Sequence, residues 1–145
     1  MFSKLAYSVF EQSVNDYHKF DNVDQPITNP YPKDKFEHLL YLKNWIDTVQ
    51  WHYEDIIRDP NIDPVAALTL KRKIDASNQE RTDMVEYIDG YFLQKYSHVV
   101  AKDNAKINSE SPAWAFDRLS ILDLKIYHMN EEATRPEATQ DHRDK

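Results

Sequence analysis

The sequence predicts an all-α protein, an antiparallel helical bundle of about four helices of which one is very long. Apolar residues recur at spacings of three and four along most of the chain, which is typical of one face of an α-helix. No stretch shows the alternation of polar and apolar residues that a strand requires. The 145 residues are 41% hydrophobic and include no cysteine, so one core forms without disulfides. We expect a single domain over residues 1–133 and a polar tail over residues 134–145.

The first predicted helix covers residues 2–20, because its apolar positions follow the helical spacing throughout. Residues 21–33 carry Pro26, Pro30 and Pro32. Proline fixes φ and lacks a backbone donor, so this segment is predicted to be a loop across one end of the bundle.

The second predicted helix follows a capping box formed by Asp34 and Glu37, three residues apart. Its apolar stripe continues to residue 57. The helix should end before Asp59, because the residue that precedes Pro60 disfavours helical geometry.

The third predicted helix is the longest. Asp63 and Pro64 form an N-cap followed by proline at the first helical position. The periodicity continues past Gly90 to about residue 101. We expect one continuous helix with a kink near Gly90, which is the only glycine of the sequence.

The fourth predicted helix repeats the signal of a cap followed by proline at Ser111 and Pro112 and runs to about residue 132. Thr134 and Pro136 then suit the first turn of one more helix, which the last residues only begin.

Charge and glycine content exclude several classes of function. A net charge of -7 repels a phosphate backbone, so nucleic acid is not an expected partner. One glycine is too few for phosphate-binding loops or nucleophile elbows. The sequence starts with no secretory signal and contains no apolar run of membrane-spanning length, so we expect a cytoplasmic protein with no membrane contact.

The end of the second helix carries the first candidate site. His52 continues the apolar face and Asp55 lies one turn further on, with Glu54 and Arg58 nearby. A histidine and a carboxylate in this arrangement can bind a metal or relay a proton. The alternative is a core histidine oriented by Asp55, with Arg58 in a surface ion pair.

The middle of the third helix carries the second candidate site. The apolar stripe, extended backwards, lands on Arg81, Asn78, Asp75 and Lys71. Buried polar groups need partners, so a ligand or a polar network is expected there, unless the helix face is simply solvated. A hairpin centred near residue 61 would place Lys71 beside His52.

A further cluster on the fourth helix comprises Asp117, Arg118 and Lys125. Asp117 in the first turn favours the helix dipole, which alone can explain it. If the third and fourth helices form a plain hairpin, Asp117 lies too far along the bundle to share a site with His52.

Three ordered motifs resemble the bacterial family called domain of unknown function 4254. They are residues 51–58, residues 71–81 and residues 111–129, and the resemblance spans about residues 17–145. The resemblance implies a helical protein, often found near glycosyltransferases of envelope polysaccharide synthesis, and it implies no activity. Members of the family usually continue into another long helix, so we expect the final residues to be the start of a truncated one.

Three functional hypotheses follow. The first is a domain that binds or processes a phosphorylated or nucleotide-linked sugar, with Lys71 and Arg81 holding the anion and His52 and Asp55 moving a proton. The second is a non-catalytic partner of a glycosyltransferase whose polar residues fix helix register. The third is a divalent-metal hydrolase using His52, Asp55, Glu54 and Asp75. It is disfavoured because the cluster contains only one histidine and Lys71 would compete with the cation, so no metal ligand is assigned. The cofactor, and whether the chain forms a homo-oligomer, stay open.

Overall fold

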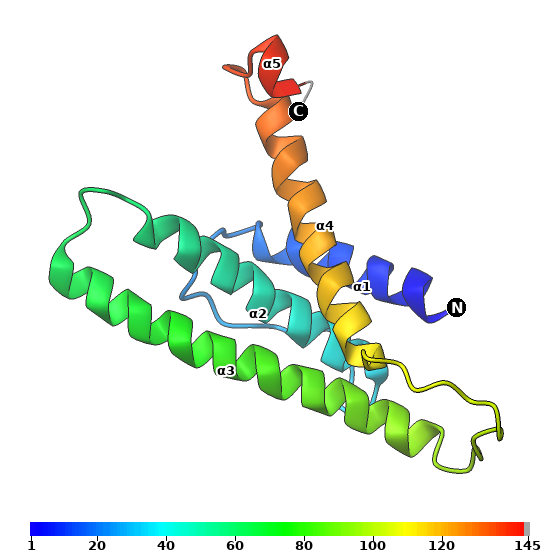
Figure 1. The fold of residues 1–145 in the computed structure, drawn as a ribbon. Coiled ribbons are helices and arrows are strands. Elements are labelled where there is room, and N and C mark those ends of the chain that lie inside the picture. Colours follow the sequence, from blue (N-terminus) through cyan, green and yellow to red (C-terminus); the bar gives the residue numbers. More distant parts are fainter. Residues whose placement is uncertain (144–145) are drawn as a thin grey trace.

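The computed structural model describes residues 1–143, which fold into helices joined by loops, with no strand in that range (Figure 1). The all-α prediction is therefore confirmed. The helices are α1 (Phe2–Tyr17), α2 (Phe36–Ile57), α3 (Pro64–Lys95), α4 (Pro112–Thr134) and the short α5 (Gln140–Arg143).

The predicted helix starts are correct at three helices, and the cap of α3 is the clearest case. The Asp63 carboxylate accepts hydrogen bonds from the backbone N–H groups of Val65 and Ala66 at 3.0 and 2.9 Å. Asp63 thus satisfies two of the donors that a helix N-terminus leaves free. The capping box at Asp34 is wrong, because Lys35 is the N-cap of α2 and no side chain caps that terminus.

Two helix ends differ from the prediction. The first helix stops at Tyr17, three residues before the expected end. The longest helix passes through Gly90 without a break but ends at Lys95, before residue 101. Beyond it the backbone N–H of Val99 donates to the carbonyl of Tyr96 at 2.9 Å, which closes a turn. The turn pairs these backbone groups without a helix. The apolar spacing after Gly90 therefore continues beyond the end of the helix.

The arrangement of the helices departs from a plain up-down bundle at α4. Figure 1 shows α2 and α3 lying antiparallel and α1 on the other side of α2. α4 crosses these helices steeply, and its C-terminal half projects away from them with α5. The backbone N–H of Ala113 donates to Asp89 at 3.1 Å, so α4 begins opposite the last third of α3. The crossing brings α4 into contact with α1, α2 and α3 together.

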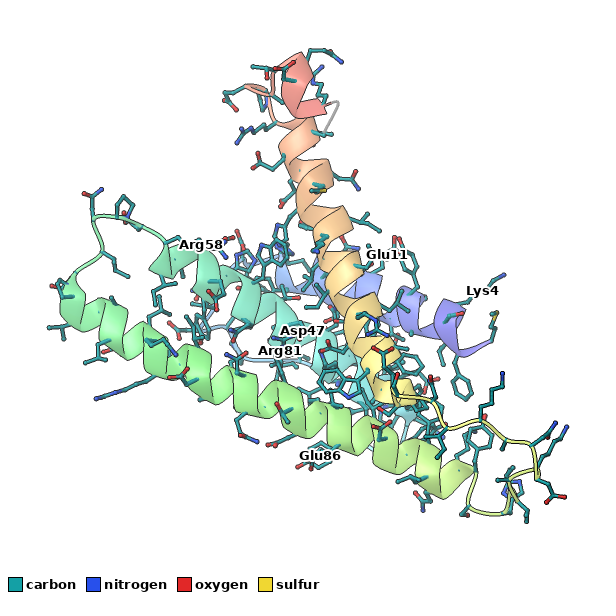
Figure 2. All side chains as sticks on the ribbon, in the orientation of Figure 1. Lys4, Glu11, Asp47, Arg58, Arg81 and Glu86 are labelled. Atoms are coloured by element: carbon teal, nitrogen blue, oxygen red, sulfur yellow. The ribbon has the colours of Figure 1, made fainter. Side chains whose placement is uncertain are left out.

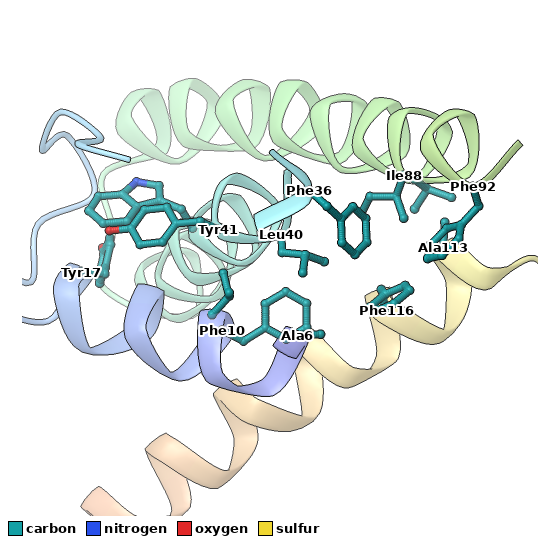
Figure 3. Packing of buried hydrophobic residues seen from close by; sticks show 13 residues of the cluster. Ala6, Phe10, Tyr17, Phe36, Leu40, Tyr41, Ile88, Phe92, Ala113 and Phe116 are labelled. Carbon is teal, nitrogen blue, oxygen red and sulfur yellow. The ribbon is translucent and has the colours of Figure 1, made fainter. Parts of the chain in front are cut away.

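The hydrophobic core lies where these four helices meet (Figure 3). Phe36 packs edge-on against Phe92 and Phe116, with ring centroids 5.4 and 5.5 Å apart. Phe10 and Leu40 are fully buried beside them. Burial of each such side chain contributes roughly 1.5–3 kcal/mol, which fixes α4 across the bundle. In the described part of the chain, no helix is both long and apolar enough to cross a membrane.

Candidate functional site

A charged pair lies fully buried in the middle of α2. The apolar spacing that runs through Phe36 and Leu40 continues, three and four residues at a time, onto Lys43, Asn44 and Asp47. The Lys43 ammonium contacts Asp47 one turn away and lies 2.8 Å from a carboxylate oxygen of Asp117 on α4. Because an unpaired buried charge is very costly, this pairing is what allows Lys43 to face the core.

Arg81 of α3 and Ser120 of α4 complete this network. Arg81 Nε donates to Asp47 at 2.7 Å, and Ser120 Oγ donates to the other oxygen of Asp47 at 2.6 Å. Asn44 Nδ2 donates to Ser120 at 3.0 Å. Figure 2 shows Asp47 and Arg81 facing each other between α2 and α3. Two cations meet two carboxylates, so the network is charge-compensated and joins three helices.

Two cavities flank the Arg81 side chain. One, of about 240 Å³, lies between α2 and α3, and the other, of about 180 Å³, lies between α3 and α4. Asn78 and Arg81 line both of them. We call the two together the Arg81 groove, and its remaining side chains include Trp51, Glu54, Asp55, Arg58, Trp114 and Asp117.

The predicted juxtaposition of His52 with Lys71 is wrong. Lys71 pairs with Asp75 in solvent, because α3 turns Ile74 and Ser77 towards the bundle interior. Asp75 lies on the exposed side with it. Asn78 is also exposed, but it borders the Arg81 groove.

Near the end of α2 the predicted residues separate into two environments. Glu54 and Asp55 line the Arg81 groove, and Arg58 pairs with Asp55 at 3.2 Å on the surface. His52 instead lies 3.7 Å from Asp21, in the loop after α1.

The second predicted cluster also divides. Asp117 joins the buried network through Lys43 and lies 3.5 Å from Arg81, so α3 and α4 do not form the plain hairpin on which its predicted separation from His52 depended. The reason is the crossing of α4 near Asp89. Arg118 pairs with Glu110 at the surface, and Lys125 is exposed.

Three histidines meet where α1, α2 and α4 converge. One ring nitrogen from each of His18, His52 and His128 lies within 4.8 Å of the other two. Among the described residues, these three histidines form a group that could hold a metal ion. The Nε2 atoms of His18 and His52 are 3.2 Å apart. All three side chains are half-buried.

Hydrogen bonds fix which nitrogens of the histidine cluster carry protons. His18 Nδ1 lies 2.7 Å from the carbonyl oxygen of Val14, so Nδ1 donates and Nε2 is left with its lone pair. His128 Nδ1 lies 3.0 Å from the Glu131 carboxylate, and its Nε2 is buried with no hydrogen-bond partner in the described structure. His52 Nε2–H is then the donor to His18 Nε2.

Aromatic rings hold the three imidazoles in place. The ring of His18 stacks on Tyr127, with centroids 4.2 Å apart. The ring of His52 stacks on Tyr17 and that of His128 stacks on Trp51, each with centroids 5.0 Å apart. Burial is the main cause that lowers the pKa of both His18 and His52, which favours neutral rings.

Sequence reasoning overlooked Lys43, Asp47 and Ser120, and it placed His52 without His18 or His128. For the α2 pair a signal existed, since Lys43 and Asp47 interrupt an apolar stripe at core-facing positions. No signal joins the three histidines, because their meeting depends on the direction in which α4 crosses.

Comparison with known proteins identifies one family. A family model described as "Protein of unknown function (DUF4254)" matches residues 37–145. The match begins after α1, later than the resemblance suggested. No curated protein and no solved structure matches the chain.

Proposed function

The chain belongs to the family described as protein of unknown function DUF4254, and we propose that it is a bacterial, cytoplasmic helical domain that binds a phosphorylated sugar in the Arg81 groove. The family resemblance implies that such proteins are often found near glycosyltransferases. This context favours a sugar phosphate over other anions as the ligand. The ligand would then be an intermediate of envelope polysaccharide synthesis.

The proposal rests on the N–H groups that the Arg81 guanidinium leaves available for a ligand. Its Nε–H is held by Asp47 at 2.7 Å, whereas Nη1 and Nη2 have only long contacts, each of 3.5 Å, to Asn78 and Asp117. A guanidinium offers five N–H donors, so most of those on Arg81 are free for a ligand. Bidentate binding of a phosphate to a positioned arginine is a strong and geometrically specific interaction. The buried network thus supplies a fixed anchor at the edge of a cavity.

The other lining residues suit a sugar ring. The Glu54 carboxylate can accept hydrogen bonds from hydroxyl groups, and the Asn78 amide can both donate and accept. Trp51 and Trp114 offer aromatic surface on either side of Arg81. Each cavity is smaller than the roughly 300–1,000 Å³ of a drug-sized site, so a monosaccharide phosphate fits better than a nucleotide-linked sugar.

Arg58 provides the sharpest test, because it borders the groove without belonging to the buried network. Its ion pair with Asp55 is exposed and worth little, so the side chain is free to turn to an anion. We expect hexose 1-phosphates to bind the wild-type chain and to bind Arg58→Gln about 10–100-fold more weakly, since one charge-assisted hydrogen bond is lost. Isothermal titration calorimetry measures this directly.

Arg72→Gln is the matched control, because Arg72 is exposed on α3 outside the groove. It should bind as the wild-type chain does. Equal affinities for all three proteins, or no binding of any sugar phosphate, would contradict the proposal.

A second candidate function is a non-catalytic partner of a glycosyltransferase. It is favoured by one observation: the projecting half of α4 exposes Leu122, Ile126 and Met129 along one side. An apolar stripe on a projecting helix is a common feature of protein interfaces. Under this reading Asp47→Asn would weaken association with the partner by disturbing α4, and sugar phosphates would leave the melting temperature unchanged.

A further inference from the structure

We propose that His18, His52 and His128 form a binding site for a divalent transition-metal ion of the Zn²⁺ type. The proposal is independent of the Arg81 groove. It gives His52 a role as a metal ligand, with two other histidines in place of the Asp55 carboxylate as its partners.

The spacing of the ring nitrogens supports the site. In a tetrahedral zinc centre with Zn–N bonds of about 2.0–2.1 Å, two ligand nitrogens lie roughly 3.3 Å apart. The Nε2 atoms of His18 and His52 are already 3.2 Å apart. The His128 nitrogen lies within 4.8 Å of both, so a small movement of one ring brings it to the ligand distance.

The hydrogen bonds of His18 and His128 follow the pattern that metal-bound histidines show, and an ion would replace the hydrogen bond between His52 and His18, with release of the His52 Nε2 proton. A ligand histidine usually donates its second N–H to a carbonyl or a carboxylate, which orients the ring and fixes the tautomer. His18 donates to the Val14 carbonyl and His128 donates to Glu131. The Nε2 of His128 is buried and has no hydrogen-bond partner in the described structure, and its lone pair would coordinate the ion.

The surroundings of the cluster favour a cation and a rigid site. Asp21 lies 3.7 Å from His52 and Glu131 lies 3.0 Å from His128, and these two carboxylates offset the charge of an ion. Each imidazole is also stacked on an aromatic ring, which keeps it in place before an ion arrives.

Imidazole ligands suit zinc, copper and nickel, and three of them leave a fourth coordination position open. The ligands come from α1, α2 and α4, so the ion would tie α4 to the rest of the bundle. Trp51 stacks on His128 and also lines the Arg81 groove, so its fluorescence should report binding of the ion.

The test is a titration of the full chain, free of any polyhistidine tag and stripped of metal, with Zn²⁺ in competition with a chromogenic chelator. We expect a single ion per chain. His18→Ala, His52→Ala and His128→Ala should each weaken Zn²⁺ binding by more than the roughly 10–100-fold that loss of an outer-shell partner costs. His98→Gln, at an exposed position outside the cluster, should bind like the wild-type chain.

A spectroscopic measurement on the unaltered chain keeps the test valid if a variant fails to fold. Co²⁺ should give the visible absorption of a tetrahedral nitrogen-ligated ion, and Zn²⁺ should shift the NMR signals of these three imidazoles but not those of His98. Absence of stoichiometric binding would overturn the proposal. So would binding that survives the loss of His128 and His52 together.

Discussion

Replacing Asp47 by asparagine tests whether the buried ion pairs between α2, α3 and α4 stabilise the fold. The Asp47 side chain is fully buried and accepts hydrogen bonds from Lys43, Arg81 and Ser120. Asparagine keeps the shape but removes the charge, which leaves Lys43 with only Asp117 as its carboxylate partner. Breaking a buried pair in this way costs about 3–5 kcal/mol of the free energy of unfolding. For a chain of this length the melting temperature should fall by about 10–15 °C.

The chain contains its own control for this change. Lys71 and Asp75 form an ion pair with the same four-residue spacing, but on the exposed face of α3. Exposed pairs contribute roughly 0–1 kcal/mol, so Asp75→Asn should be nearly neutral. Urea unfolding followed by circular dichroism measures both variants. Equal losses for Asp47→Asn and Asp75→Asn would mean that the buried pair contributes no more to stability than an exposed one.

If Asp47→Asn does not fold, Ser120→Ala provides a milder probe of the same network. It removes the hydrogen bond of 2.6 Å to the Asp47 carboxylate and the one of 3.0 Å that Ser120 accepts from Asn44. A hydrogen bond to a charged group contributes about 1.5–3 kcal/mol and a neutral one about 0.5–1.5 kcal/mol, so the free energy of unfolding should fall by at least about 2 kcal/mol.

Two other changes should stabilise the protein. Burial, and secondarily Glu11, raise the pKa of Asp123 to about 6, so the native state holds a proton that the unfolded state releases near pH 4. The free energy of unfolding should therefore fall by up to about 3 kcal/mol as the pH rises from about 4 to about 6. Asp123→Asn should abolish this pH dependence in urea titrations, and it should be more stable than the wild-type chain above about pH 6. A wild-type curve that is flat there would contradict the shift. Gly90→Ala should raise the free energy of unfolding by about 0.5–1 kcal/mol, because the site is helical, exposed and has no atom within 4 Å of an added Cβ; a decrease in thermal stability would show that Gly90 is needed for another reason.

The helices could be predicted from the sequence because their signals are local. The apolar spacing and the cap at Asp63 depend on residues within a few positions of one another. The direction of α4 could not be predicted, since it follows from packing of Phe116 against Phe36 and Phe92, residues distant in the chain. The error at Lys71 and Asp75 has the same origin: a polar stripe shows which face is unusual but not which neighbour it meets.

The candidate sites follow this division. Arg81, Asn78 and Arg58 were identified because each interrupts or extends a helical pattern. The partners that give Arg81 its orientation lie on two other helices, and the histidine cluster depends on the crossing of α4 over α1 and α2. Such contacts are set by tertiary packing, to which a helical periodicity contributes no information.

The indole N–H signals of the three tryptophans test whether a sugar phosphate binds across Arg81. Trp51 and Trp114 line the groove, whereas Trp45 lies in a different cavity, beside Tyr53 and Lys73. In an NMR titration of the full chain with a hexose 1-phosphate, the Trp51 and Trp114 signals should move together with one dissociation constant, and the Trp45 signal should stay in place. A shift confined to Trp45, or no shift at all, would mean that no sugar phosphate binds in the Arg81 groove.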